Sequence, residues 1–254
     1  MTNKNNVNSW LTEENRNKAY KRNALENASR NFDDNDALTV NTLEAIYGQE
    51  SSFGNEKILK NDKRGEVGAA GHFQIQKNVA EKHSKTKITK ANDPRFDIDN
   101  ASDIAARYLV ELNYLFSDNT ILTKDKYDKP LIFTFLVSDI NERKLFAIAA
   151  YNAGQGTIAK AQMLAKEVGK DATKWEIIKE FLKEAGAKDA KVKEIIEYVE
   201  SVIAYEKEFS QKSKANKKLK NKEPKKVSGN NSEDGHWVTL DNGNHVFIGN
   251  KKVG

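Results

Sequence analysis

The sequence predicts a mainly α-helical domain that contains a small irregular or β loop region and is followed by a C-terminal β-hairpin. Three observations lead to this fold class. Apolar residues recur at helical spacing over most of residues 38–209. The stretch 52–71 carries four glycines among charged residues, which is typical of a loop or small hairpin. Near the C-terminus, HWVTLDNGNHVFI places Asn-Gly between two apolar runs, the pattern of a hairpin turn.

The elements follow in order along the chain. A polar helix is expected over 9–31, and a second helix over 40–51 that buries one apolar face. Residues 117–130 are polar and are expected to form a loop. The apolar run 130–137 is too short for periodicity to decide between strand and helix. Further helices are predicted at 74–83, 100–116, 145–151, 158–168, 175–185 and 191–209.

This pattern divides the chain into four parts. Residues 1–37 form an N-terminal helical extension and residues 38–209 the main helical domain. A Lys-rich linker over 210–230 contains one of only three prolines, and residues 231–254 form the hairpin tail. A two-residue turn at Asn242-Gly243 would pair Val238 with Phe247 and Trp237 with Ile248.

Composition and charge exclude several classes of function. The net charge of +5 arises from residues 210–226, where eight lysines and one glutamate leave about −2 for the rest of the chain. The folded part is therefore not a basic nucleic-acid surface, and no nucleic-acid partner is expected. The absence of cysteine excludes disulfides and thiolate metal sites. No apolar run approaches the roughly 18 residues of a membrane span.

Glu50 is the first candidate for chemistry. It follows Leu43, Ile46 and Tyr47 at spacings that place its carboxyl group on the same face as the apolar stripe. A carboxyl group on a buried face near a helix end is partly desolvated, and desolvation raises its pKa towards the range of a useful proton donor. On this helix alone, a glutamate that simply extends into solvent at the helix end is the favoured interpretation.

Further motifs follow Glu50 in order: Glu50-Ser51-Ser52-Phe53, GAAGHFQ at 68–74, AYNAGQG at 150–156, and Glu194 four residues before Tyr198-Val199. Together they resemble the soluble lytic transglycosylase family, which is related to goose-type lysozyme. The resemblance covers about residues 38–206. It implies a lysozyme-like α+β fold and makes 38–209 the catalytic domain.

The resemblance also implies roles for individual residues. Glu50 would be the acid/base that protonates the glycosidic oxygen between MurNAc and GlcNAc in peptidoglycan. Ser51 and Gln74 would orient sugar groups or the acid, and Glu194 would support the fold or the cleft. The expected substrate-binding residues are Ser51, Gln74, Tyr151, Asn152 and Tyr198, although Tyr198 is equally open to a role as a core aromatic.

One carboxylate suffices for the implied reaction, because the C6 hydroxyl of the substrate closes a 1,6-anhydro ring and no water nucleophile is needed. Asp62, Glu66 and Asp97 lie nearby in sequence, so a muramidase that hydrolyses the same bond stays open. A catalytically inactive virion or scaffold protein with a lysozyme-like domain is the other alternative.

The chain departs from the family's usual pattern in three places. Gly65 replaces a serine, His72 replaces an apolar residue and is expected to pack in its place, and the stretch 117–144 is longer than usual. No cofactor is expected. No metal is expected either, because the four histidines show no ligand spacing.

The tail suggests how the enzyme reaches its substrate. Its sequence resembles hairpin tails of some phage head-morphogenesis and prophage proteins, and a lone hairpin is marginal in water. We therefore expect it to dock on another surface, which is either a virion or secretion component or the enzyme's own helices. Met1 to Leu11 is polar, so we expect synthesis in the cytoplasm without a signal peptide and action on the cell-wall or periplasmic peptidoglycan, after virion delivery or lysis.

Overall fold

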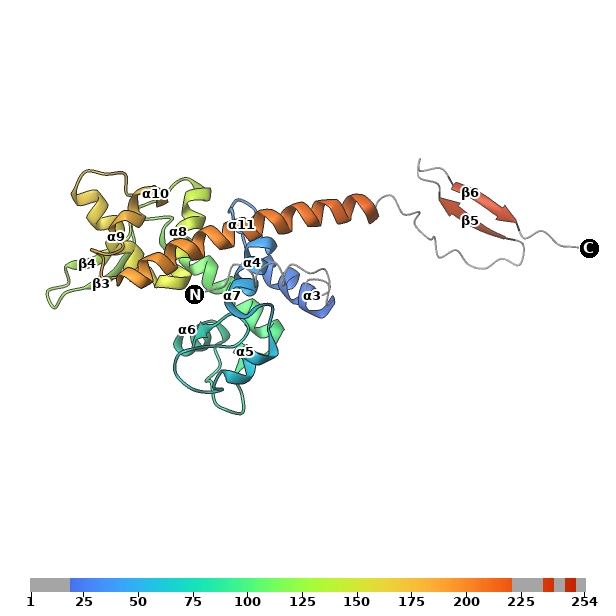
Figure 1. The fold of residues 1–254 in the computed structure, drawn as a ribbon, viewed down its shortest axis with the longest axis horizontal. Coiled ribbons are helices and arrows are strands. Elements are labelled where there is room, and N and C mark those ends of the chain that lie inside the picture. The colour runs from blue at the N-terminus through green and yellow to red at the C-terminus, as the bar shows by residue number, and fades with distance from the viewer. Residues whose placement is uncertain (1–18, 221–234, 240–244, 250–254) are drawn as a thin grey trace, which may run out of the picture. The chain divides into compact units, whose positions relative to one another are not determined.

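The computed structural model describes residues 19–220, 235–239 and 245–249. The chain separates into one compact unit, Met1–Lys207, and a second, Glu208–Gly254. The first unit is built almost entirely of helices, with two short strand pairs inserted (Figure 1). The prediction of a mainly helical fold with a small β loop region is confirmed.

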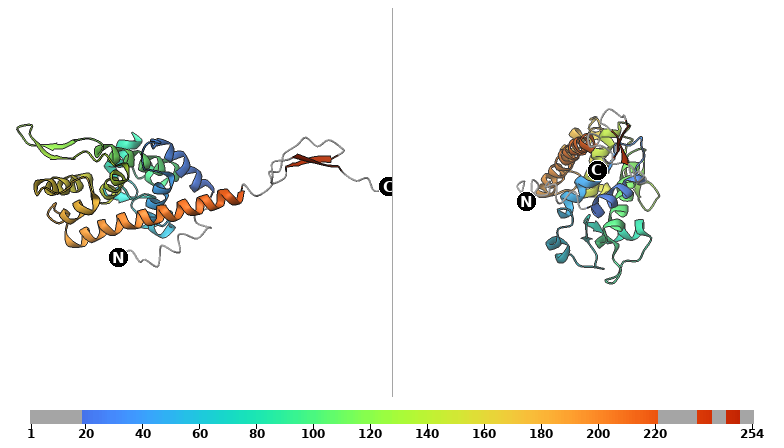
Figure 2. Two further views of the ribbon diagram at one scale, coloured as in Figure 1. Left: turned by 90° about the horizontal axis from the view of Figure 1, so that it is seen from above. Right: turned by 90° about the vertical axis from the view of Figure 1, so that its right-hand side faces the viewer.

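The helix α7, Ile98–Leu115, forms the centre of the first unit. Asp97 caps its N-terminus by accepting a hydrogen bond from the Asn100 N–H, and its apolar face is fully buried. Helices α3, α4, α6 and α8 all pack against it, as two views of the ribbon show (Figures 1 and 2). The helices, in chain order, are α3 Ala19–Ala28, α4 Val40–Ser51, α5 Glu56–Asn61, α6 Lys77–Ser84, α7, α8 Ile140–Ala153, α9 Gln155–Glu167, α10 Trp175–Ile178 and α11 Asp189–Lys220.

Two small sheets interrupt the helices. The strands β1, Ala69–Ala70, and β2, Ile75–Gln76, pair antiparallel within the glycine-containing region. The strands β3, Ile121–Lys124, and β4, Pro130–Phe133, form a hairpin after α7. The expectation of a loop over 117–130 is therefore wrong for β3. This strand forms because its backbone groups hydrogen-bond to the apolar strand β4, and its own polar sequence does not indicate that pairing.

Helix boundaries differ from expectation in the second half of the chain. The predicted helix 175–185 is a single α turn, α10, followed by a 3-10 turn at Lys179–Phe181. The helix α11 continues to Lys220, so the first eleven residues of the segment expected to be linker are helical. Lysine is a good helix former, so a run rich in lysine and without proline can prolong an existing helix. The only proline of that segment, Pro224, comes after α11 ends.

The two ends of the chain also differ from the expected division. In the N-terminal part, α3 packs on α7, and Arg22 forms an ion pair with Glu44 of α4 at 2.6 Å, so residues 19–31 belong to the main packing. In the tail, strands β5, Gly235–Thr239, and β6, His245–Gly249, pair with Trp237 opposite Phe247. The predicted pairing is one residue out of register, because five residues separate the strands and not two.

Candidate functional site

Glu50 lies in the last turn of α4, at the point where the chain leaves the core. Thr39 caps the helix through a reciprocal hydrogen-bond pair with Thr42, and Leu43, Ile46 and Tyr47 are fully buried. The helix ends because Ser52, Phe53 and Gly54 all have positive φ. Phe53 is held in this unusual conformation by burial against the Tyr47 ring, 5.5 Å away. The turn fixes the position of the helix end that carries Glu50.

The Glu50 carboxyl group is partly desolvated and receives one strong hydrogen bond. Tyr198 of α11 donates its hydroxyl to Glu50 Oε1 at 2.6 Å. Burial raises the Glu50 pKa from its ordinary value of 4.5 to about 7, against the opposing effects of the Tyr198 hydrogen bond and the Lys191 charge. The negative charge of Glu194 raises it further. A carboxyl group with this pKa exchanges its proton readily near neutral pH.

Tyr151 of α8 lies beside this pair. Its hydroxyl donates to the backbone carbonyl oxygen of Phe73 at 2.9 Å, and its ring contacts Tyr108 with centroids 5.3 Å apart. Burial, then the negative charge of Glu50, raise the pKa values of Tyr151 and Tyr198 well above 10. Both phenols therefore stay neutral and act as hydrogen-bond donors at physiological pH.

Asn152 belongs to a short polar chain between α8 and α11. Its Nδ2 donates to Glu194 Oε1 at 3.1 Å, and the same oxygen accepts from Lys191 Nζ at 2.8 Å. Among the described side chains, Asn152 Oδ1 is a buried acceptor without a hydrogen-bond partner. Such an atom costs free energy unless a ligand or water supplies a donor.

Gln74 closes the turn between β1 and β2 with a φ of +46°. Its Nε2 donates to Asp62 Oδ2 at 2.7 Å and to the Gly71 carbonyl oxygen at 3.0 Å. Asp62 Oδ2 also accepts the Gly71 N–H at 2.8 Å. Gln74 is thus held by its neighbours in a fixed orientation.

These residues surround one cleft of about 990 Å³. Five of the six residues expected to form the site line it: Glu50, Gln74, Tyr151, Asn152 and Tyr198. Strands β1 and β2 with helices α6 and α7 contribute Ala69, Ile75, Gln76, Val79 and Tyr108, and α11 contributes Ala190, Lys191, Lys193, Glu194 and Glu197.

Ser51 is placed differently from the expectation of a sugar contact. Its side chain is fully buried, donates to the His72 carbonyl oxygen at 2.6 Å and accepts the Gly54 N–H at 3.0 Å. It does not line the cleft, because the side chain following Glu50 on the helix points into the core. Ser51 therefore positions the end of α4. This agrees with the expectation that Ser51 orients the acid, and disagrees with the expectation that it contacts the sugar.

The transglycosylase SLT domain profile matches residues 28–174, more than half of the chain. The chain belongs to the transglycosylase SLT family. This confirms the resemblance that the motifs indicated. The match ends before α11, so the positions of Glu194 and Tyr198 in the site rest on geometry.

One curated relative is the membrane-bound lytic murein transglycosylase F of Desulfosudis oleivorans, 26% identical over 148 residues. The alignment covers 55% of this chain and 27% of the relative, so the chain matches about a quarter of that protein's length. Within the described residues, no helix is long and apolar enough to cross a membrane.

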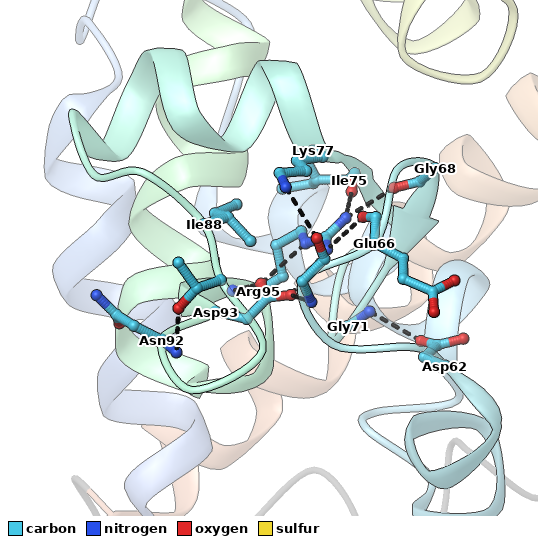
Figure 3. A network of polar contacts seen from close by, with 12 residues as sticks. Asp62, Glu66, Gly68, Gly71, Ile75, Lys77, Ile88, Asn92, Asp93 and Arg95 are labelled. Carbon is cyan, nitrogen blue, oxygen red and sulfur yellow. Dashed lines mark hydrogen bonds and ion pairs between the residues drawn. The ribbon is translucent and has the colours of Figure 1, made fainter.

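A buried ion pair that the sequence did not reveal holds the loop beside the cleft of this SLT domain (Figure 3). Asp93 and Arg95 have side chains with no exposed surface, and they pair at 2.7 Å. The Arg95 guanidinium also donates to the carbonyl oxygens of Glu66, Gly68 and Ile75. Asp93 accepts the Gly65 N–H at 2.9 Å. A charged pair two residues apart gives no sign in the sequence that it will be buried.

Two of the three departures from the family pattern, Gly65 and His72, have structural explanations. Gly65 has a φ of +78°, and a Cβ atom there would lie 2.5 Å from the Lys90 backbone nitrogen. His72 is buried, and its Nδ1 lies 3.1 Å from the Tyr47 hydroxyl. Burial, followed by the charge of Lys21, lowers the His72 pKa to about 4, so the imidazole is neutral. His72 packs inside the SLT domain, as expected.

The carboxylates expected as possible partners of Glu50 in hydrolysis lie elsewhere. Asp62 is bound to Gly71 and Gln74, Asp97 caps α7, and Glu66 extends into solvent beside Lys63. Glu194 and Glu197 are the other carboxylates lining the cleft. Among the residues that the structure describes, no three His, Asp or Glu side chains gather closely enough to hold a metal ion.

Proposed function

We propose that this protein is a peptidoglycan lytic transglycosylase that cleaves the β-1,4 bond between MurNAc and GlcNAc and leaves 1,6-anhydro-MurNAc ends. Membership of the SLT family and the name of the curated relative support this reaction. The observation that carries the proposal is Glu50, a cleft carboxyl group with a pKa of about 7 and a hydrogen bond from Tyr198.

In the first step, protonated Glu50 donates its proton to the glycosidic oxygen as the bond to the MurNAc anomeric carbon breaks. The GlcNAc side leaves with a new hydroxyl group, and positive charge develops on the anomeric carbon. Glu50 becomes a carboxylate in a partly desolvated position. The Tyr198 hydroxyl, 2.6 Å from Oε1, stabilises this anion as it forms.

In the second step, the Glu50 carboxylate accepts the proton of the MurNAc C6 hydroxyl, and the oxygen bonds to the anomeric carbon. The ring closes, Glu50 is protonated again, and no water is consumed. Gln74, Tyr151 and Asn152 are proposed as substrate contacts, since all three line the cleft. The unpartnered Asn152 Oδ1 supports a ligand donor at that atom, such as an acetamido N–H.

Hydrolysis of the same bond is the alternative, and the nearby Glu194 is the observation that favours it. Its carboxylate is close enough to affect the Glu50 pKa and could direct a water molecule. Its oxygen Oε1 already accepts hydrogen bonds from Lys191 and Asn152, which makes the transglycosylase reaction the better supported one.

Digestion of purified sacculi followed by mass spectrometry tests the proposal. Anhydro products weigh one water less than the reducing ends that a muramidase leaves. Glu50→Gln should reduce product formation by about 10² to 10⁴, whereas Glu56→Gln on the exposed α5 should leave it unchanged. Reducing ends would establish hydrolysis, and no product from the unaltered protein would indicate an inactive scaffold protein.

We further propose that the segment after α11 delivers the enzyme, through a virion or secretion component, and takes no part in catalysis. The residues that line the cleft all fall between 49 and 198. Removal of residues 221–254, which keeps α11 whole, should preserve activity on soluble glycan fragments and barely change the thermal midpoint. Loss of activity on fragments would make the tail part of the enzyme. Recovery of the same virion or secretion components by full-length and truncated protein would contradict the docking role.

A further inference from the structure

The charged side chains of the cleft are distributed unevenly. Lining residues from β1, β2, α6 and α7 are all uncharged, and α8 contributes only Tyr151, Asn152 and Ala153. Apart from Glu50, every charged lining residue comes from the first turns of α11: Lys191, Lys193, Glu194 and Glu197. One side of the cleft is therefore polar and neutral, and the α11 side carries two cations and two anions.

The four charges form two pairs of different character. Lys191 and Glu194 are 2.8 Å apart, and Asn152 holds the same Glu194 oxygen. Lys193 and Glu197 are 3.9 Å apart, at the limit of an ion pair, with side chains 76% and 52% exposed. An exposed pair at that distance contributes little to stability, so either charge can exchange its partner for a ligand group at small cost.

The chemistry of the proposed substrate shows what these charges can meet. In peptidoglycan that carries stem peptides, the lactyl carboxyl group is bound in an amide and the glycan strand is uncharged. Ionised carboxylates and amines occur only in the stem. The stem is attached to the same MurNAc whose anomeric carbon reacts at Glu50, so it must leave the strand close to this residue. Lys191 and Glu194 are near enough to affect the Glu50 pKa, which places the α11 side of the cleft beside the acid.

We propose that Lys193 and Glu197 of α11 bind the charged groups of the stem peptide, so that the enzyme prefers glycan strands that carry stems. This rests on the proposed function and specifies its substrate class. Lys193 pairs with a stem carboxylate and Glu197 with a stem amine, while Lys191 and Glu194 stay bound to each other and to Asn152.

The test compares two substrates and two double variants. The substrates are glycan strands of one length, with stems and after an amidase has removed them and the freed lactyl carboxyl groups have been converted to methyl amides, so that the stripped strand carries no charge. Lys193→Met/Glu197→Gln removes the proposed contacts. Lys60→Met/Glu56→Gln is the matched control, because it removes a similarly exposed pair on α5, away from the cleft. Circular dichroism and the thermal midpoint check that both variants fold.

The KM of the Lys193/Glu197 variant for stem-bearing strands should rise about 3- to 10-fold, as expected for two exposed charge contacts, with kcat little changed. Stripped strands should show a far smaller change, and the control variant none on either substrate. Equal changes on both substrates, or none on either, would overturn the inference. So would an unaltered protein that digests only stripped strands. An unaltered protein inactive on both would instead contradict the proposed function.

Discussion

The ion pairs on the two sides of the cleft differ in burial and therefore in what they do for the structure. The Asp93–Arg95 pair beneath the β1–β2 loop has no exposed side-chain surface, and its remaining hydrogen-bonding groups are occupied by backbone atoms. The Lys193–Glu197 pair on α11 is largely in solvent. A buried pair that is fully hydrogen-bonded fixes the shape of the backbone around it, because removing one partner leaves an uncompensated charge. An exposed pair fixes little and stays open to other partners.

The largest effect is expected from removing the buried cation. Arg95→Met should destabilise the protein by about 3–5 kcal/mol, since the Asp93 carboxylate loses its partner and three carbonyl oxygens lose a donor. Thermal or denaturant unfolding measures the change. Arg107→Met is the matched control, because Arg107 forms an exposed pair with Asp103 on α7. Similar losses in the two variants would show that burial does not distinguish the two kinds of pair.

A second substitution probes the close approach of the loop to Arg95. Gly71 has a φ of +80°, and a Cβ atom would lie 2.0 Å from the Arg95 carbonyl oxygen. Gly71→Ala should cost about 1–3 kcal/mol more than Gly169→Ala. Gly169 has a φ of +75° with open space around it, so it carries the same backbone penalty without the clash. Equal costs in unfolding experiments would mean that the loop can move away from Arg95.

Glu50 lines the same cleft as the α11 charges, and its raised pKa predicts a dependence of stability on pH. Between pH 4.5 and about 7 the unfolded chain releases the Glu50 proton while the folded protein keeps it. The contribution of Glu50 to the free energy of unfolding is therefore fully present below pH 4.5 and is lost as the pH rises through about 7. Glu50→Gln should unfold like the unaltered protein at pH 4 and be more stable at pH 8 by about 1–3 kcal/mol, after allowance for partial exposure. A difference that does not grow with pH would contradict the buried acid.

The smallest expected effect concerns the hydroxyl that α11 provides. The Tyr198 hydrogen bond lowers the Glu50 pKa, so Tyr198→Phe should move the alkaline limb of the kcat/KM profile to higher pH. The rate at the optimum should also fall, because the Glu50 anion loses a donor. Tyr114→Phe, on an exposed tyrosine of α7 that does not line the cleft, is the control. If the alkaline limb of the kcat/KM profile stays at the same pH, the Tyr198 hydrogen bond does not act on Glu50 during catalysis.

Local patterns predicted most of the helices and the helix that carries Glu50. The apolar spacing of Leu43, Ile46 and Tyr47 correctly indicated the buried face of α4. The same reasoning missed β3, whose strand depends on pairing with β4, and it put the tail hairpin one residue out of register. It also ended α11 too early, since lysines that suit a linker suit a helix equally well.

Helical periodicity and short motifs are local properties of the chain, so the amino-acid sequence was enough to predict the fold class, the family and the residues of the motifs. The contacts of those residues could be learned only from the three-dimensional fold. In the folded chain the Ser51 side chain points into the core, and Tyr198 hydrogen-bonds to Glu50, 148 positions away in the sequence. Asp93 and Arg95 form a buried ion pair. Burial and pKa depend on which distant segments meet around a side chain. That information is not contained in the spacing of neighbouring residues.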